Sequence, residues 1–337
     1  MLYFHHPSSL ESDPRSLIPE HPDIPERIGA IERAMAAADW LGLERRQAPG
    51  AEQSRLELVH TSEHVRYIAG LSESGPAEID DDTVVTPASY DAAVHAVGGA
   101  CAMVQALVAG EAEAAFCGLR PAGHHADRNR AMGFCLFNNI AVAAQLAIAE
   151  LGVERVLIVD WDVHHGNGTA EIFRKRDDVL YASIHQADLF PGTGKITDAG
   201  SGDGRGYTLN LPVPSGATDE MWLSLVEYVV IPVALEFGPQ LILISAGFDA
   251  HRDDPLGGCL LDSDSFAQMA CHVRDAARTL ATPVGAVLEG GYDLEALAAS
   301  AVATVAALGG AGEAESIAPD PLVTSRASAH VSHFWEL

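Results

Sequence analysis

Short apolar runs alternate with longer, alanine-rich or amphipathic segments along most of this chain. Several of the short runs are apolar at nearly every position, which is typical of parallel strands covered on both faces. We therefore predict strands at Leu2–His5, Leu56–His60, Ala114–Leu119, Arg155–Asp160, Val179–His185, Tyr207–Pro212, Leu241–Ala246 and Val284–Glu289.

Helical patterns occupy the intervals between these runs. Capping residues such as Thr61 and Asp262 stand before some of them, and Gly-Pro or Gly-Gly pairs follow others. Two more segments are rich in alanine, the strongest helix former. The predicted helices are Pro25–Leu41, Ser62–Leu71, Ser89–Ala109, Asn138–Leu151, Asp219–Phe237, Asp262–Leu280 and Leu294–Leu308.

The repeated strand–helix units predict an α/β fold, with one mostly parallel sheet of about eight strands and helices on both faces. No internal repeat and no linker divides the chain. We therefore expect a single domain over residues 1–310, with a tail, 311–337, packed on the same domain. The segments 7–25 and 186–206 are long loops rich in Gly, Pro and Asp, and such loops are often functional.

The chain carries 20 Lys and Arg residues against 47 Asp and Glu residues, a formal net charge of −27. Such a surface repels phosphate backbones, which argues against direct nucleic-acid binding and favours cationic substrates. The five cysteines form no C-x-x-C pair, as expected in a reducing compartment. The first residues do not resemble a signal peptide, and no run reaches the roughly 18 apolar residues of a membrane span. We expect a cytoplasmic protein, and a homo-oligomer remains compatible with the sequence.

Titratable side chains gather directly after four of the predicted strands. In open α/β sheets, ligands bind at the carboxyl ends of the strands. Because those ends lie along one edge of a parallel sheet, we expect the four polar segments to form one site. These segments are Arg120–Ala126, Asp160–Gly168, Ala246–Asp249 and Glu289–Tyr292.

The most distinctive segment contains Asp160, Asp162 and His164. Alternate residues of an extended chain point the same way, so these three side chains can share one side. Asp249, after another strand, would complete an Asp/His/Asp set, and three protein ligands with an open position are the arrangement of catalytic zinc. The competing interpretations are a solvated acidic strand end, or an aspartate that caps a helix starting near Gly166.

The tandem His124 and His125 lie in a glycine-flanked turn that can aim both rings at one pocket. A neutral imidazole beside a metal-bound water can accept its proton, and a second imidazole can be held by a carboxylate such as Asp160. Tyr292 follows two glycines, and its phenol would suit an oxyanion-hole donor. The simpler alternatives are two surface histidines and a tyrosine that caps a helix.

Other motifs do not indicate a catalytic or nucleotide-binding function. Gly192–Lys195 looks like the end of a P-loop, but Leu189 stands where that motif needs glycine. No G-x-S-x-G nucleophile elbow occurs. The tandem His5–His6 is interpreted as a histidine pair without a catalytic function. The histidines interpreted as structural, without partners in the sequence, are His60, His64, His95 and His272.

Taken together, these motifs are similar to those of the histone deacetylase family, in particular its class II-like bacterial members. The resemblance implies the arginase–deacetylase α/β fold, with the deacetylase catalytic domain in residues 1–310. The matching motifs fit in order and spacing from about residue 5 to about residue 308. They are RPAGHHA (120–126), GFCLFNN (133–139), DWDVHHGNGT (160–169), FPGTG (190–194), SAGFD (245–249) and LEGGYD (288–293).

The resemblance also implies that the protein binds a catalytic and a structural metal ion. It implies one catalytic Zn²⁺ with Asp162, His164 and Asp249 as ligands, although such ligands also tolerate iron. It further implies a structural K⁺ or Na⁺, which the family carries near Asp160, Asp162, His164 and Ser183.

The remaining roles come from the same resemblance. His125 would be the general base and later the acid that protonates the leaving amine. His124, bonded to Asp160, would be its electrostatic partner, and Tyr292 would polarise the acetyl carbonyl.

The channel for the substrate is implied in the same way. Gly133, Phe134 and Phe190 would sandwich a lysine-like stem. Asn167 stands where class I members carry an aspartate, which should leave His125 less firmly held as an imidazolium. Leu256 stands where polyamine-specialised relatives carry an acidic residue, and its apolar character argues against polyamines.

The sequence thus predicts zinc-dependent hydrolysis of acetyl-amides, above all acetyl-lysine in a protein or peptide. An acetylpolyamine or other small acetylated amine is the alternative substrate. An arginase-like binuclear manganese site would need further carboxylates after Asp249, where Ala250 and His251 follow. A catalytically silent acyl-lysine binder is a third interpretation, but every expected site residue is present.

Overall fold

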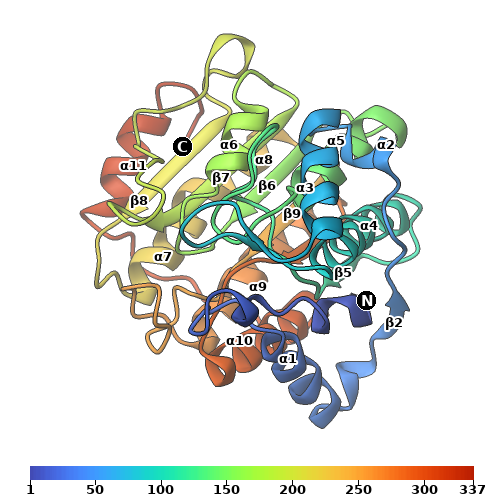
Figure 1. Cartoon of the computed structure of the whole chain (residues 1–337). Coiled ribbons are helices and arrows are strands. Elements are labelled where there is room, and N and C mark those ends of the chain that lie inside the picture. Colours follow the sequence, from blue (N-terminus) through green and yellow to red (C-terminus); the bar gives the residue numbers. More distant parts are fainter.

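The computed structural model describes residues 1–337 and contains one eight-stranded sheet in which all neighbouring strands are parallel. The strand order is β2-β1-β5-β10-β9-β6-β7-β8 (Figure 1). The strands of the sheet are β1 (Leu2–His5), β2 (Glu44–Gln47), β5 (Ala114–Cys117), β6 (Val156–Asp160), β7 (Val179–Gln186), β8 (Thr208–Val213), β9 (Leu241–Ala246) and β10 (Val284–Leu288). A separate antiparallel pair joins β3 (Ala77–Glu78) to β4 (Val84–Val85).

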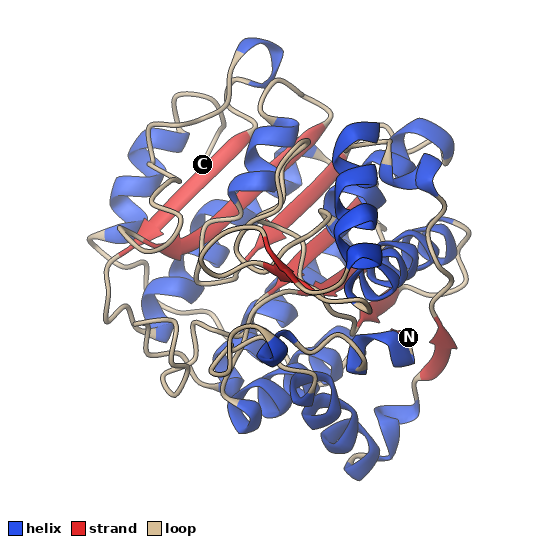
Figure 2. Ribbon diagram, in the orientation of Figure 1, coloured by secondary structure: helices blue, strands red, loops and turns tan.

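Helices lie on both sides of this sheet (Figure 2). They are α1 (Glu26–Ala37), α2 (Gln53–Leu56), α3 (Ser62–Ser74), α4 (Ser89–Val108), α5 (Asn139–Glu150), α6 (Asn167–Phe173), α7 (Asp219–Leu225), α8 (Ile231–Phe237), α9 (Ser263–Leu280), α10 (Leu294–Leu308) and α11 (Val323–Val331). A single α/β domain with helices on both faces agrees with the sequence prediction.

Strand β6 shows how the two layers of helices divide the core. Leu157 and Val159 belong to one buried cluster of 49 residues, whereas Val156 and Ile158 belong to another of 40. Successive strand residues point to opposite faces, so each cluster lies on one face of the sheet. Both faces are therefore buried, which explains why the strands are apolar at nearly every position.

The four strands that precede the polar segments are neighbours. Strands β5, β10, β9 and β6 lie side by side in the middle of the sheet. Their carboxyl ends bring residues from across the whole chain to one place, as expected for parallel strands.

Seven of the eight predicted strands form, and one prediction is wrong. Segment Leu56–His60 is a helical turn in which Val59 N and His60 N donate to Leu56 O. Its buried residues Leu56, Val59 and His60 are spaced three and four apart, which is a helical spacing that the apolar run concealed.

The sequence analysis missed β2, whose residues are Glu44, Arg45, Arg46 and Gln47. This strand pairs only with β1 at the edge of the sheet and buries none of its side chains. An exposed edge strand rich in charge has no apolar pattern to detect, and the charges oppose pairing with other chains.

All seven predicted helices are present, with shifted ends. The first stops at Ala37, because Trp40 and Leu41 adopt positive φ. The segment Asp219–Phe237 divides into α7, a π-helical turn (226–230) and α8, and Pro232, which has no N–H to donate, follows the turn. The unpredicted α2, α6 and α11 are shorter than the window a helical pattern needs.

Helix α4 is long and apolar enough to cross a membrane by length and composition, although the sequence analysis found no such run. In the fold, 72% of its most apolar 18-residue window is buried inside the protein. Its hydropathy is therefore that of a core helix.

The C-terminal segment packs on the rest of the fold. Ala327 and Val331 of α11 belong to the larger buried cluster. Trp335 Nε1 donates to Gly206 O at 2.7 Å, and its ring packs edge-on against Tyr207. Helix α11 and Trp335 thus contact the same core and sheet as the residues before them.

Candidate active site

The carboxyl ends of β6 and β9 bring Asp162, His164 and Asp249 together. One ligand atom from each residue lies within 4.8 Å of the other two, and all three residues are buried. His164 Nδ1 lies 3.1 Å from Asp162 Oδ1 and 3.0 Å from Asp249 Oδ2. Two carboxylates and one imidazole therefore converge on one point.

The backbone around this point permits a close approach of the two carboxylates. Asp249 Oδ1 accepts a hydrogen bond from Val163 N at 2.7 Å, and Asp162 Oδ2 accepts one from Gly290 N at 2.8 Å. A Cβ at position 290 would lie 2.1 Å from Asp249 Oδ2, so only glycine fits there. Gly290 thus makes room for the carboxylates, whereas Gly291, with φ +118°, shapes the loop that carries Tyr292.

The donor set fits a divalent cation. Burial raises the pKa of Asp249, and the charge of Asp162 raises it further. Burial acts to lower the pKa of His164, but the neighbouring carboxylates outweigh it and raise that pKa. Buried carboxylates side by side need a positive partner. A mixed oxygen and nitrogen set of three suits zinc or iron.

His124 pairs with Asp160, the last residue of β6. Its Nδ1 lies 3.1 Å from Asp160 Oδ2, which also accepts a hydrogen bond from Tyr181 Oη at 2.8 Å. Burial acts to lower the pKa of His124, but Asp160 and Asp162 outweigh it and raise the pKa to about 10. His124 is therefore an imidazolium at neutral pH.

His125, the next residue, has the opposite character. Its Nδ1 lies 2.9 Å from Asn167 Oδ1, and Asn167 Nδ2 donates to His125 O at 3.3 Å. Burial, and then the positive charges of His124 and His164, lower the pKa of His125 well below its ordinary value. Because the amide oxygen only accepts, Nδ1 carries the proton of the neutral ring and Nε2 keeps its lone pair.

The loop that carries Tyr292 is held from two sides. Arg27 Nε and Nη2 donate to Gly291 O and Glu289 O, both at 2.6 Å, and the guanidinium lies 4.7 Å from the Tyr292 ring centre. Asp254 Oδ2 accepts a hydrogen bond from Tyr292 N at 2.6 Å. Burial raises the pKa of Tyr292 well above its ordinary value, so the phenol keeps its proton and can donate a hydrogen bond.

The sequence analysis gave no role to Glu289, although it noted the residue at a strand end. Its Oε2 accepts hydrogen bonds from Gly123 N at 2.7 Å and His124 N at 3.2 Å, and its Oε1 accepts one from Ser245 Oγ at 3.1 Å. Glu289 thus fixes the turn that presents the two histidines.

A buried charge network was also missed. Asp23 Oδ1 accepts from Arg27 Nη1 at 2.5 Å and from Arg120 Nε at 2.7 Å, and all three side chains are buried. One signal was available, because Arg27 shares a helical stripe with Ile31 and Met35 in the first predicted helix. A charge on an apolar stripe needs a buried partner.

The predicted channel residues Gly133, Phe134, Phe190 and Leu256 all line one cavity of about 390 Å³. The same cavity is lined by His125, His164 and Tyr292, and by residues of both long loops, including Ile18, His21 and Leu189. Its lining also includes the acidic residues Glu20, Asp81 and Asp82.

Two contacts shape this channel. The Phe190 ring stands edge-on to the His125 ring, 5.1 Å between centres. Gly133 has φ +56°, and a Cβ there would lie 2.5 Å from a ring carbon of His125. A larger cavity, of about 740 Å³, lies at the opposite ends of β5 and β10, away from the triad of Asp162, His164 and Asp249.

Other residues singled out from the sequence behave as follows. Ser183 pairs in register with Asp160, and its Oγ lies 2.9 Å from His185 Nδ1. His251 does not belong to the triad of Asp162, His164 and Asp249, and its Nδ1 accepts a hydrogen bond from Asp253 N at 3.2 Å.

Three of the histidines that the sequence analysis interpreted as structural form hydrogen bonds with backbone atoms, in agreement with that interpretation. They are His60, His64 and His272. His95 was wrongly thought to have no partner, because it contacts His6 and Asp91.

A buried Asp/His/Asp triad lies beside a protonated histidine, a neutral histidine and a tyrosine, and this combination is typical of a hydrolytic enzyme. The model of the family described as "Histone deacetylase domain" matches residues 21–308. The chain therefore belongs to the histone deacetylase family of hydrolases.

Individual relatives agree with this assignment. The chain is 44% identical to the "Histone deacetylase-like amidohydrolase" of Pseudomonas aeruginosa over 74% of its own length and 66% of that protein. It is 41% identical to a "Probable deacetylase" of Archaeoglobus fulgidus, covering 81% of this chain and 77% of the other. The crystal structure of the HDA15 HD domain superposes with a TM-score of 0.91 at 35% identity, over 99% of this chain and 95% of that one.

The match spans about half of some relatives. Histone deacetylase 15 of Arabidopsis thaliana is 39% identical over 86% of this chain, but only 52% of its own length is covered.

Proposed function

We propose that this chain is a zinc-dependent deacetylase that hydrolyses acetyl-amides, with N6-acetyl-lysine in a protein or peptide as its substrate. One observation carries the proposal. His125, His164 and Tyr292 line a single cavity of about 390 Å³, and the carboxylates of Asp162 and Asp249 converge on His164.

The metal would be held by Asp162, His164 and Asp249. When bound, a Zn²⁺ ion supplies Lewis-acid polarisation of the acetyl carbonyl and lowers the pKa of a water molecule. The proposal also includes a structural K⁺ or Na⁺ near Asp160 and Ser183, which adjoin in the sheet.

His125 is the general base. It is neutral, its Nδ1–H is engaged by Asn167, and its Nε2 is free to take a proton from the attacking water. The same nitrogen then returns the proton to the leaving amine. His124, held as an imidazolium by Asp160, adds positive charge beside the anionic intermediate without exchanging its own proton.

Tyr292 donates a hydrogen bond to the carbonyl oxygen as it gains negative charge. Its high pKa keeps the phenol protonated, and Arg27 and Asp254 hold its loop so that little reorganisation is needed. Preorganised donors of this kind typically contribute about 10²–10³ in rate.

The channel matches a lysine side chain. Phe134 and Phe190 offer aromatic walls for a four-carbon stem, and Glu20, Asp81 and Asp82 around the cavity favour a substrate that carries further positive charge. An acetylated polyamine shares that charge and is the second candidate. Leu256 lies in the cavity wall and offers no charge to a second ammonium group, which favours the lysine substrate.

The test is kcat/KM of the zinc-loaded protein on an acetyl-lysine peptide and on an N-acetylated polyamine, side by side. We expect faster peptide turnover that disappears with a chelator. A higher kcat/KM on the acetylated polyamine would instead identify acetylated polyamines as the substrate. Absence of turnover on both substrates, with zinc bound, would refute deacetylation of these amines.

Tyr292→Phe tests the mechanism itself. We expect it to keep the fold and the zinc and to lower kcat by about 10²–10³, with KM nearly unchanged. Wild-type kcat in the metallated variant would remove the phenol from the mechanism.

A further inference from the structure

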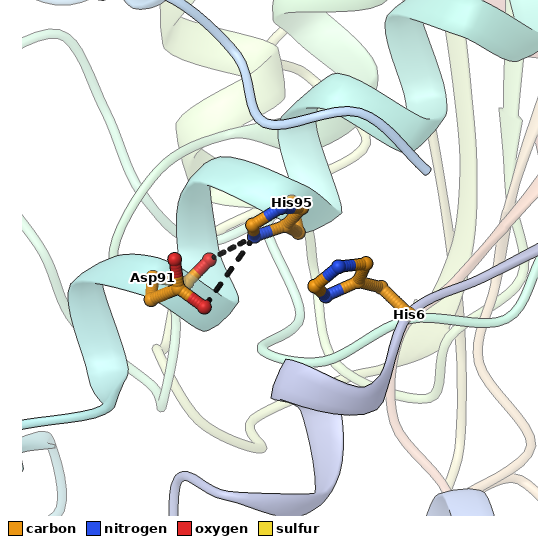
Figure 3. Close-up of side chains that lie close together, drawn as sticks. All are labelled: His6, Asp91 and His95. Carbon is orange, nitrogen blue, oxygen red and sulfur yellow. Dashed lines mark hydrogen bonds and ion pairs between the residues drawn. The ribbon is translucent and has the colours of Figure 1, made fainter. Parts of the chain in front are cut away.

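A second group of metal-ligating side chains lies outside the active site. It consists of His6, at the end of β1, and Asp91 and His95 on α4 (Figure 3). One ligand atom from each lies within 4.8 Å of the other two. Both histidines are half-buried and the aspartate is exposed, so the group is open to solvent.

The hydrogen bonds of His95 engage one ring nitrogen and leave the other available to a metal. Its Nδ1 donates to Asp91 O at 2.8 Å, and Asp91 Oδ2 lies 3.6 Å from the same nitrogen. Metal-binding histidines usually donate their other ring N–H to a carbonyl or carboxylate in this way, which fixes the tautomer. The lone pair of His95 Nε2 is therefore free, and no protein atom donates to it.

Space for an ion exists beside that nitrogen. Residue 50 is glycine, and a Cβ there would lie 3.4 Å from His95 Nε2. A side chain at position 50 would fill the volume that a ligand to Nε2 needs. The exposed Gly50 leaves this volume to solvent.

His6 supplies the second imidazole. Its ring stacks on the His95 ring, with 3.6 Å between centres and 5° between planes. Imidazole lone pairs lie in the ring plane, so two parallel rings cannot both point at one ion. Binding therefore requires the His6 ring to turn out of the stack, and His6 is the movable partner because it lies in a loop, held by Ser8 at 2.8 Å.

We propose that His6 and His95 form a second binding site for a divalent transition metal such as Zn²⁺, separate from the catalytic centre, with Asp91 orienting the His95 ring through Nδ1. Imidazole nitrogens suit zinc. Mg²⁺ and Ca²⁺ prefer oxygen ligands, so these two ions would bind here only weakly.

An ion at this site would tie two parts of the fold together. It would join the end of β1 to the second turn of α4, 89 residues farther along (from 6 to 95). The next turn of the chain carries Ser9, whose carbonyl accepts from Arg120 Nη1 at 2.8 Å. The ion would thus steady the segment that supports the active-site turn, without touching the catalytic residues.

The test counts zinc per chain after equilibrium dialysis of the full-length protein at micromolar free Zn²⁺. We expect two ions per chain in the wild type and one in His6→Ala and in His95→Ala, with deacetylase activity retained. His333→Ala, which removes an exposed histidine outside the group, is the matched control and should keep two. One ion in the wild type, or two in His95→Ala, would overturn the proposal.

Two further readouts separate this site from the catalytic one. Asp249→Ala should keep one zinc, and the double variant Asp249→Ala/His95→Ala should keep none. In NMR titrations the ring protons of His6 and His95 should lose the mutual shielding of the stack as zinc is added. Unchanged ring-proton shifts at saturating zinc would refute ligation by these two rings.

Discussion

The pairing of His125 with an amide rather than a carboxylate leads to a sharp prediction for Asn167→Asp. Asn167 Oδ1 lies 2.9 Å from His125 Nδ1, and the asparagine is half-buried. Aspartate is nearly isosteric, so the substitution adds a negative charge beside the imidazole with little change in shape. We expect it to raise the pKa of His125.

The size of the effect follows from Coulomb's law. A unit charge about 4 Å from the ring centre, at an effective dielectric constant of about 20, stabilises the imidazolium by about 4 kcal/mol. At about 1.4 kcal/mol per pKa unit, this sets an upper limit of about 3 units. The variant also loses the hydrogen bond from Asn167 Nδ2 to His125 O, and the new carboxylate is partly desolvated. We therefore expect a rise of about 1–3 units.

The assay is the pH dependence of kcat/KM for the zinc-loaded enzyme. A general base works only when it is neutral, so the rate falls as the pH drops through its pKa. Raising that pKa moves the acidic limb of the profile to higher pH. The variant should lose activity at mildly acidic pH and keep it at alkaline pH.

A control separates this local effect from the added charge. Asn129→Asp makes the same change at an exposed position and should leave the profile in place. If the acidic limb of folded, metallated Asn167→Asp did not move, His125 would not be the group that titrates in it.

Three other substitutions test the site. Asp249→Ala should lower zinc affinity at the catalytic centre by at least tenfold, measured by competition with a chelator; wild-type affinity would contradict its role as a ligand. Gly133→Ala should abolish most activity because its Cβ would lie 2.5 Å from a ring carbon of His125, the proposed general base. The matched change Gly216→Ala, at φ +79° with nothing within 4 Å, should lose stability but keep kcat. Asp254→Asn should lower kcat by about tenfold, because it weakens the hydrogen bond that holds the backbone of Tyr292. An unchanged kcat would show that Arg27 alone is enough to hold the Tyr292 loop.

Much of this architecture is readable from the sequence because its signals are local. The central strands are buried on both faces, so their apolar runs are nearly continuous and easy to detect. Their order in the sheet is not encoded locally, yet the site did not depend on it. Any parallel arrangement brings the carboxyl ends of the strands to one edge, and Asp162, His164 and Asp249 follow strands directly.

The features that could not be predicted from the sequence share a physical cause. Strand β2 is an exposed edge that buries no side chain, so its sequence shows only charge. Arg27 and Asp23 act through contacts with residues far along the chain, and pairing across such distances leaves no periodic trace. His6 and His95 became a group only when β1 and α4 came together.

The reach of Arg27 has a consequence for how the molecule assembles. The hydrogen bonds from its guanidinium to Glu289 O and Gly291 O span 262 and 264 residues of sequence. Contacts of such long range form slowly, because the chain must first close a large loop. On the ribosome, Arg27 is synthesised long before β10, and a guanidinium destined for the interior must meanwhile stay hydrated. The Tyr292 loop can therefore acquire its final shape only after Glu289 and Gly291 have been synthesised and have met Arg27.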